Sequence, residues 1–245
     1  MDPPRTPDIT GSAAISVSKA SKSFLHQPAL RDITLTLSAK SLTLLCGANG
    51  SGKSTLLRAI AGLSRLDSGS LSYSGAPKGA APRALVGYLG HHLMLYPHLS
   101  VLENGEFAAR MLGTACDIGA QLNEWGLEPH AHKRVHELSK GLQARAALMR
   151  IFIGEPAYLL LDEPTSALDE AGVEILARRI ERLRAANEQC CVLIATHDIA
   201  RLGSLAERVV VLGAGAILFD TENCDEIDSN RAREEAFNLY SRINR

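Results

Sequence analysis

One glycine-rich stretch, residues 47–55, constrains this chain more than any other part of its sequence. It reads Gly47-Ala48-Asn49-Gly50-Ser51-Gly52-Lys53-Ser54-Thr55 and lies between two apolar runs, 42–46 and 56–60. A buried strand, a glycine turn and a helix start, in this order, are the context in which a G-x-x-x-x-G-K-[ST] pattern binds phosphate. Backbone N–H groups of the turn converge on phosphate oxygens, and the helix N-terminus adds partial positive charge. The stretch therefore predicts a nucleotide site.

Two side chains complete the predicted site. We expect Lys53 to reach the β- and γ-phosphates of ATP, and the Ser54 hydroxyl to be a ligand of Mg²⁺. The loop alone does not indicate what the nucleotide drives.

Length and composition limit the alternatives. With 245 residues the chain has room for one large α/β domain. Its 26 basic and 27 acidic residues give a net charge of −1, so there is no electrostatic case for nucleic acid as the main partner. Five cysteines without a C-x-x-C pair are expected to be reduced thiols of a cytosolic protein.

A membrane, if one is involved, is expected to be met through another protein. The longest apolar stretch, 209–219, is interrupted by two glycines and is too short to cross a bilayer. Residues 1–12 are polar and proline-rich, which favours a flexible tail over a signal peptide.

Strand and helix patterns predict an α/β fold. Alternating residues at 14–18 and 33–37 indicate an antiparallel sheet ahead of the nucleotide loop. Unbroken apolar runs at 158–162 and 191–195 are typical of central parallel strands that are buried on both faces. The stretch 93–153 has helical spacing, starting after a capping Ser100, and is expected to be inserted between strands.

These elements define the predicted domain organisation. We expect a P-loop NTPase core with a mainly parallel central sheet, an N-terminal antiparallel β subdomain and an inserted α-helical subdomain. This domain is predicted to span 13–222, ending in a strand pair at 209–219, with a helical extension at 223–245.

Three polar side chains follow the predicted central strands and converge on the nucleotide loop. Ligands of parallel sheets bind at the carboxyl ends of the strands, where Asp162, Glu163 and His197 are expected to lie. Asp162 suits a Mg²⁺ partner held through water, and Glu163 can polarise the water that attacks the γ-phosphorus. His197 can hydrogen-bond the transferred phosphoryl group. The alternative, a solvated turn, loses weight because the nucleotide loop belongs to the same sheet.

At this point the chain resembles the ATP-binding subunit of ABC transporters, over about residues 15–219. Asp162-Glu163-Pro164 follows the nucleotide loop in the family's order, and the resemblance makes His197 the switch histidine. It also makes Phe24 the aromatic residue that stacks on adenine, where the residues alone allow a core position. The family signature is Leu138-Ser139-Lys140-Gly141-Leu142-Gln143, and its D-loop is Ser166-Ala167-Leu168-Asp169.

The resemblance implies a shared site. Ser139 is expected to cap a helix whose N-terminus is a second anion site. In the family two subunits, identical or related, pair head to tail, and each signature closes over the ATP of its partner. ATP binding then favours the closed dimer, and hydrolysis lets it open. The resemblance also implies a transmembrane permease subunit and a location at the cytoplasmic face of the membrane.

Two departures from the family pattern stand out. The family usually has glutamine at the loop that leads to the helical block, where this chain has His91-His92. Either histidine could take the glutamine's role, and the alternative is a histidine packed in the loop. Lys140 and Leu142 replace residues that are often Gly and Gln, while Ser139 and Gly141 are kept.

The run 87–92 is similar to the haem-exporter type of ATPase of cytochrome c maturation, which implies an exporter. His130, His132 and His136 lie among basic residues and favour a solvated face over a zinc site.

Two other functions remain open from the sequence. One is a soluble ABC-type ATPase that acts on nucleic acid or the ribosome, although the chain has neither a long coiled coil nor a basic stripe. The other is a regulator that binds ATP without turnover, against which the presence of Glu163 and His197 argues.

Overall fold

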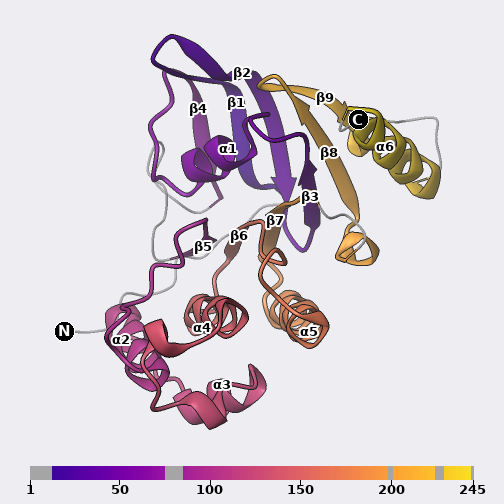
Figure 1. Cartoon of the computed structure of the whole chain (residues 1–245). Helices are drawn as coiled ribbons and strands as arrows, with labels where there is room; N and C mark the ends of the chain where they lie inside the picture. The colour runs from indigo at the N-terminus through magenta and orange to yellow at the C-terminus, as the bar shows by residue number, and fades with distance from the viewer. Residues whose placement is uncertain (1–12, 75–84, 198–200, 224–228, 244–245) are drawn as a thin grey trace.

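A six-stranded sheet forms the centre of the molecule (Figure 1). The computed structural model describes residues 13–74, 85–197, 201–223 and 229–243. The strand order is β5-β6-β7-β3-β8-β9, and β9 alone pairs antiparallel. The strands are β3 (Leu42–Cys46), β5 (Val86–Leu89), β6 (Tyr158–Asp162), β7 (Cys191–Ala195), β8 (Arg208–Gly213) and β9 (Ala216–Asp220). The apolar runs predicted as central strands are thus confirmed.

A second, antiparallel sheet covers the N-terminal side. Its order is β2-β1-β4, from β1 (Ala13–Phe24), β2 (Gln27–Ser38) and β4 (Ser68–Tyr73). Val17 faces both Leu35 and Leu71 across the two ladders. The predicted sheet exists, but its first two strands are longer than the alternating patterns, because register shifts along β1 interrupt the alternation without ending the strand.

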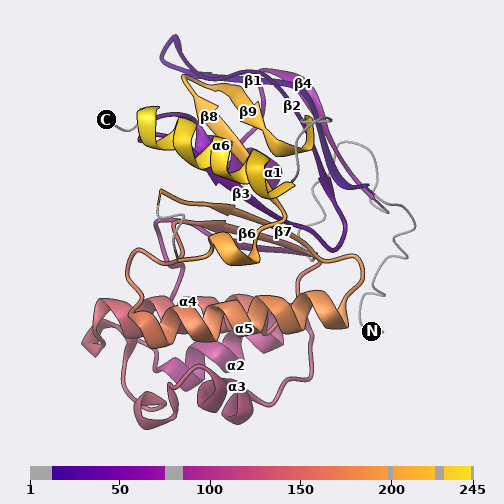
Figure 2. The same ribbon diagram turned by 90° about the vertical axis from the view of Figure 1, so that its right-hand side faces the viewer.

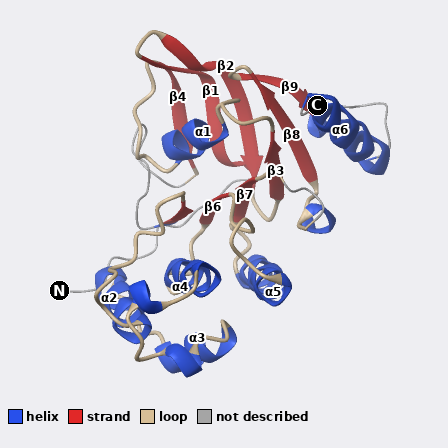
Figure 3. Ribbon diagram, viewed as in Figure 1, coloured by secondary structure: helices blue, strands red, loops and turns tan. Residues whose placement is uncertain are grey.

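Helices cover both faces of the central sheet. α1 (Lys53–Ile60) lies between the two sheets, while α4 (Lys140–Phe152) and α5 (Glu170–Ala186) cover the opposite face (Figure 2). α2 (Val101–Leu112) and α3 (Ile118–Glu124) lie beyond α4, so strands and helices largely separate into two halves (Figure 3). α6 (Ser229–Ile243) lies beside β8.

Helix α2 begins at a capping box formed by Ser100 and Glu103. Ser100 accepts a hydrogen bond from the N–H of Glu103 at 3.1 Å, and the Glu103 carboxylate accepts one from the N–H of Ser100 at 2.7 Å. This reciprocal capping box confirms the helix start predicted at Ser100.

Two cores hold the layers together because each central strand is buried on both faces. One core joins Leu44, Leu161 and Ile194 to α4 and α5, and the other joins Leu45, Leu160 and Leu193 to α1 and the antiparallel sheet. Burial on both faces explains why these strands are apolar at every position.

The register of the central sheet places the predicted site. Asp162 pairs with Ala195, and Leu45 also pairs with Ala195, so three strands end at the same level. The residues that follow them, Gly47, Glu163 and His197, therefore leave the sheet at one edge.

Candidate functional site

The glycine-rich loop between β3 and α1 depends on glycine at its last turn. Gly52 has φ of +108°, and a Cβ there would lie 2.4 Å from the carbonyl oxygen of Ala29. Both the left-handed backbone and the contact exclude a larger residue. The loop therefore packs closely against the backbone of β2 at Gly52.

Lys53 closes this loop on itself. Its Nζ donates to the carbonyl oxygens of Gly47 at 2.6 Å and Ala48 at 3.2 Å, and its side chain is buried. These bonds satisfy a buried ammonium in the absence of phosphate. Directly before the loop, burial raises the pKa of the Cys46 thiol to about 12, so the base of the loop carries no thiolate.

A pocket of about 540 Å³ opens over the loop. It is lined by the loop itself and by side chains from three other segments. The lining residues are Ala29, Asn49, Gly50, Ser51, Gly52, Lys53, Ser54, Thr55, His91, Asp162 and Glu163. Predicted residues from three parts of the sequence, the loop, His91 and the Asp162–Glu163 pair, thus meet in one cavity.

Asp162 has the features of a metal partner. Its side chain is 3% exposed, and neither carboxylate oxygen has a hydrogen-bond partner among the residues that the structure describes. Such a buried carboxylate needs a compensating cation or ordered water. In the described part of the chain no three His, Cys, Asp or Glu side chains cluster as a metal site. A cation here would share its ligands with a phosphate, as Mg²⁺ does.

Glu163 and His197 form a pair above Asp162. Nδ1 of His197 lies 2.8 Å from Oε2 of Glu163, which also accepts the His197 backbone N–H at 3.2 Å. Glu163 has φ of +52°, a strained conformation for a non-glycine residue, and its N–H donates to Ala195 at 2.8 Å. The strain turns the carboxylate out of the strand and into the pocket.

The structure distinguishes the two loop histidines. His91 lines the nucleotide-loop pocket, whereas His92 lines only a neighbouring groove, which His91 also lines. His91 is exposed, so the alternative of a histidine packed in the loop is wrong for this residue. Phe24 is 52% exposed at the end of β1, which contradicts the core interpretation, and Nζ of Lys22 lies over its ring, 5.5 Å from the ring centre.

The predicted signature forms the N-terminus of α4. The hydroxyl of Ser139 accepts a hydrogen bond from the N–H of Leu142 at 3.4 Å, which confirms the predicted cap. Ser139 and Lys140 are exposed. Gln143 instead turns back and donates from Nε2 to the carbonyls of Val135 at 3.0 Å and Leu138 at 3.1 Å.

Comparison with known proteins decides the family. The family model described as ABC transporter matches residues 30–166. The chain belongs to this family, as its ATP-binding domain. It is 37% identical over 211 residues to the Fe(3+) ions import ATP-binding protein FbpC 2 of Rhodococcus jostii, covering 83% of this chain and 61% of that protein. It is 32% identical over 236 residues to the glutamate/aspartate import ATP-binding protein GltL of Escherichia coli K12, covering 90% of this chain and 97% of that protein.

Solved structures agree on the fold. An ATP-binding subunit of an ABC transporter superposes with a TM-score of 0.82, covering 93% of this chain and 99% of that one, at 24% identity. A dimeric bacterial ABC transporter cassette superposes with a TM-score of 0.75, covering 84% and 97%, at 25% identity. The predicted fold class is confirmed. The haem-exporter type is not confirmed, since the two relatives named above are import proteins.

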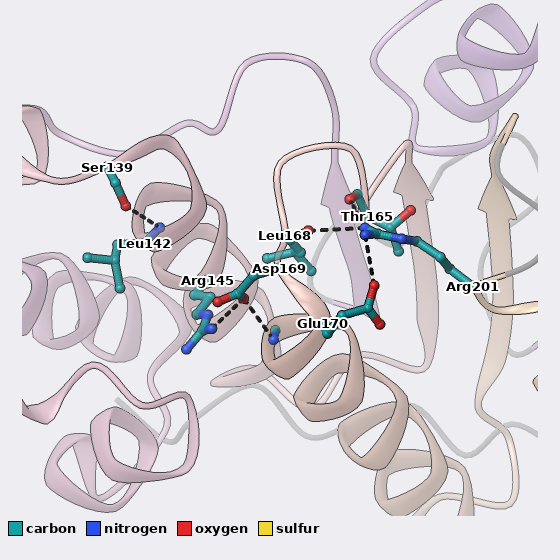
Figure 4. Close-up of polar contacts among 9 residues, drawn as sticks. Ser139, Leu142, Arg145, Thr165, Leu168, Asp169, Glu170 and Arg201 are labelled. Atoms are coloured by element: carbon teal, nitrogen blue, oxygen red, sulfur yellow. Dashed lines mark hydrogen bonds and ion pairs between the residues drawn. The ribbon is translucent and has the colours of Figure 1, made fainter.

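Within this ABC domain, the segment predicted as the D-loop is held from two sides by arginines that sequence reasoning missed (Figure 4). On one side Arg145, from α4, forms an ion pair with Asp169, which also caps α5 by accepting the Gly172 N–H at 3.0 Å. On the other, Arg201 donates to the carbonyls of Thr165 at 2.9 Å and Leu168 at 3.0 Å. The D-loop therefore connects the signature helix with the segment after the switch histidine.

The ion pair of Arg145 predicts an acid-sensitive contribution to stability. The hydrogen bond from Arg145, together with that from Gly172, lowers the pKa of Asp169. Arg145→Gln is expected to reduce the free energy of unfolding at neutral pH by less than about 1 kcal/mol, because Asp169 is 66% exposed. Because the pKa of Asp169 is lower in the folded protein than in the unfolded chain, its ionised carboxylate stabilises the fold at pH values above the ordinary Asp pKa. This contribution is lost as pH falls through the folded-state pKa. Urea unfolding of both proteins at decreasing pH should therefore show the difference disappearing in acid.

The control for this prediction is Arg110→Gln, which removes a weak exposed pair with Glu106 and should leave unfolding unchanged. A difference at Arg145 that stays constant down to strongly acidic pH would refute the assignment to Asp169.

Proposed function

We propose that this chain is the ATP-hydrolysing subunit of an ABC transporter and that it works as a head-to-tail dimer. The observation that carries the proposal is the pocket that joins the phosphate loop, Asp162 and Glu163, with His197 at hydrogen-bond distance from Glu163. The second support is an anion-binding helix terminus at Ser139, which is exposed on the same chain.

Hydrolysis needs several functions that side chains in and beside the pocket can supply. Lys53 leaves the loop carbonyls and binds the β- and γ-phosphates. Glu163 accepts the proton of the attacking water, and His197, at hydrogen-bond distance from Glu163, binds the γ-phosphoryl group and keeps it in register. Ser54 and Asp162 fit Mg²⁺, which when bound neutralises phosphate charge. His91, at the pocket wall, takes the position of the family's glutamine beside the attacking water.

Dimerisation follows from the position of the signature. Ser139 lies outside the pocket lined by the chain's own phosphate loop, yet its helix presents free N–H groups and partial positive charge. A phosphate reaches both anion sites at once when the signature of one chain closes over the loop of another. ATP then contributes contacts that exist only in the closed state.

Complementation between two inactive variants tests this arrangement. Lys53→Ala removes the phosphate contact and Ser139→Arg blocks the signature, so each variant alone should hydrolyse no ATP. A mixed dimer contains one intact site, formed by the loop of the Ser139→Arg chain and the signature of the Lys53→Ala chain. Random pairing should therefore restore about a quarter of the intact sites of the wild type. Phosphate release from the mixture measures the recovery.

The matched control is a mixture in which one chain carries both substitutions and the other is Lys53→Ala, which contains no intact site. Recovery in that control, or none in the first mixture while each variant still folds, would refute the shared site.

The membrane partner is proposed from a groove beside the pocket. A cavity of about 650 Å³ is lined by His91, His92, Leu93, Met94, Leu95, Pro97, Val135, His136, Lys140 and Gln143. Met94 and Tyr96 expose apolar surface at this loop, which suits a short helix of a permease subunit. His91 lines both the groove and the nucleotide pocket, so a partner that displaces His91 in the groove also changes the wall of the nucleotide pocket.

Uptake rather than export is the direction that the named relatives support. Their names give iron or acidic amino acids as cargo, and we propose import without assigning a substrate. In the described residues no helix has both the length and the apolar character that a bilayer crossing requires. We propose attachment to a permease at the cytoplasmic face of the membrane because both named relatives are import ATP-binding proteins. The net charge of −1 gives the nucleic-acid alternative no support.

A further inference from the structure

The helix α6 places a phenol on the main chain of the switch histidine. Ala236 and Tyr240 are buried on the face of α6 that packs against β8, in the same core as Val209 and Val211 (Figure 2). Tyr240 is 8% exposed, and its hydroxyl donates to the backbone carbonyl oxygen of His197 at 2.9 Å. An element near the end of the described chain thus contacts a residue of the proposed catalytic pair.

This bond fixes His197 where the sheet no longer does. The β6–β7 ladder ends at Ala195, and the Thr196 N–H makes the last bond to β3, at Leu45. The His197 N–H donates to Glu163 at 3.2 Å, and its carbonyl accepts from Tyr240. Both peptide groups of His197 are thereby oriented, which sets the position of its ring against Glu163.

We propose that Tyr240 is a positioning residue for ATP hydrolysis and acts through His197. This inference rests on the proposed function, because it needs His197 in contact with the phosphoryl group. Tyr240 reaches the site through the backbone carbonyl of His197, so its effect should fall on turnover and not on ATP binding. Small displacements of a catalytic group lower the rate steeply.

Tyr240→Phe tests the hydroxyl while keeping the ring in the core. We expect kcat to fall roughly tenfold, as loss of one hydrogen bond that favours the transition state would give, with KM for ATP unchanged. The matched control is Ser241→Ala, which removes the neighbouring hydroxyl. That hydroxyl donates to the Phe237 carbonyl within the same helix at 2.8 Å, so kcat should stay at the wild-type value.

A double-mutant cycle with His197→Ala separates positioning from general destabilisation. The residual turnover of His197→Ala should be the same with and without Tyr240→Phe, because the phenol then has no ring to position. Wild-type kcat in Tyr240→Phe, or an equal tenfold loss in the His197→Ala background, would overturn this inference alone. Wild-type turnover by His197→Ala would overturn the proposed site and the inference with it.

Discussion

Glu163→Gln is expected to lower the rate of ATP hydrolysis by about 100- to 10,000-fold, the range that a general base contributes. The amide keeps the size of the carboxylate but cannot accept the proton of the attacking water. Because Glu163 lies in the pocket with its Oε2 at 2.8 Å from His197, the substitution should disturb the chemistry and little else. Phosphate release at saturating ATP measures the loss.

The same variant should bind ATP and remain a dimer. Hydrolysis ordinarily removes the phosphate that joins the two chains, so blocking it should trap the closed form, visible by sedimentation as an ATP-dependent dimer. Glu181→Gln, at an exposed position on α5, is the control and should turn over normally. Unchanged hydrolysis in Glu163→Gln would show that another group is the base. Failure of the wild type itself to hydrolyse ATP would favour the regulator alternative.

Lys53→Ala is expected to weaken ATP binding by about 10- to 150-fold, because charge-assisted hydrogen bonds contribute about 1.5 to 3 kcal/mol each. Titration with a slowly hydrolysed ATP analogue measures the affinity directly.

Lys40→Ala is the matched control for this loss. Lys40 forms an exposed ion pair with Glu188 at 2.6 Å, far from the loop, and should bind ATP as the wild type does. Equal affinity in Lys53→Ala and Lys40→Ala would exclude the phosphate role of Lys53.

The sequence alone predicts those elements whose local residue pattern matches their position in the fold. The loop at 47–55 has a spacing that only a strand, turn and helix can satisfy, and the apolar runs of β6 and β7 reflect burial on both faces. The strand-end acids followed from those runs, since parallel strands end at one edge. Ser139 and Ser100 were predicted as caps from the residue type alone, and both cap.

Contacts between distant side chains could not be predicted in this way. Arg145 and Asp169 are 24 residues apart, and Tyr240 and His197 are 43 apart, and no periodicity relates either pair. Gly69 is a residue typical of turns, yet residues 68–70 begin β4, since Gly69 at φ of +87° packs against the backbone of Lys19 and only a glycine fits there. The predicted tail at 1–12 lies outside the described residues, as do residues 224–228 of the predicted extension.

His91 belongs to the walls of two cavities at once. Any occupant of the groove that prefers one placement of this ring must change the affinity for nucleotide, and thermodynamic linkage requires nucleotide to change the occupant's affinity by the same factor. The imidazole of His91 can thus couple the affinity for a neighbouring subunit to the affinity for a nucleoside triphosphate. Measuring either affinity with and without the other ligand would give that shared factor.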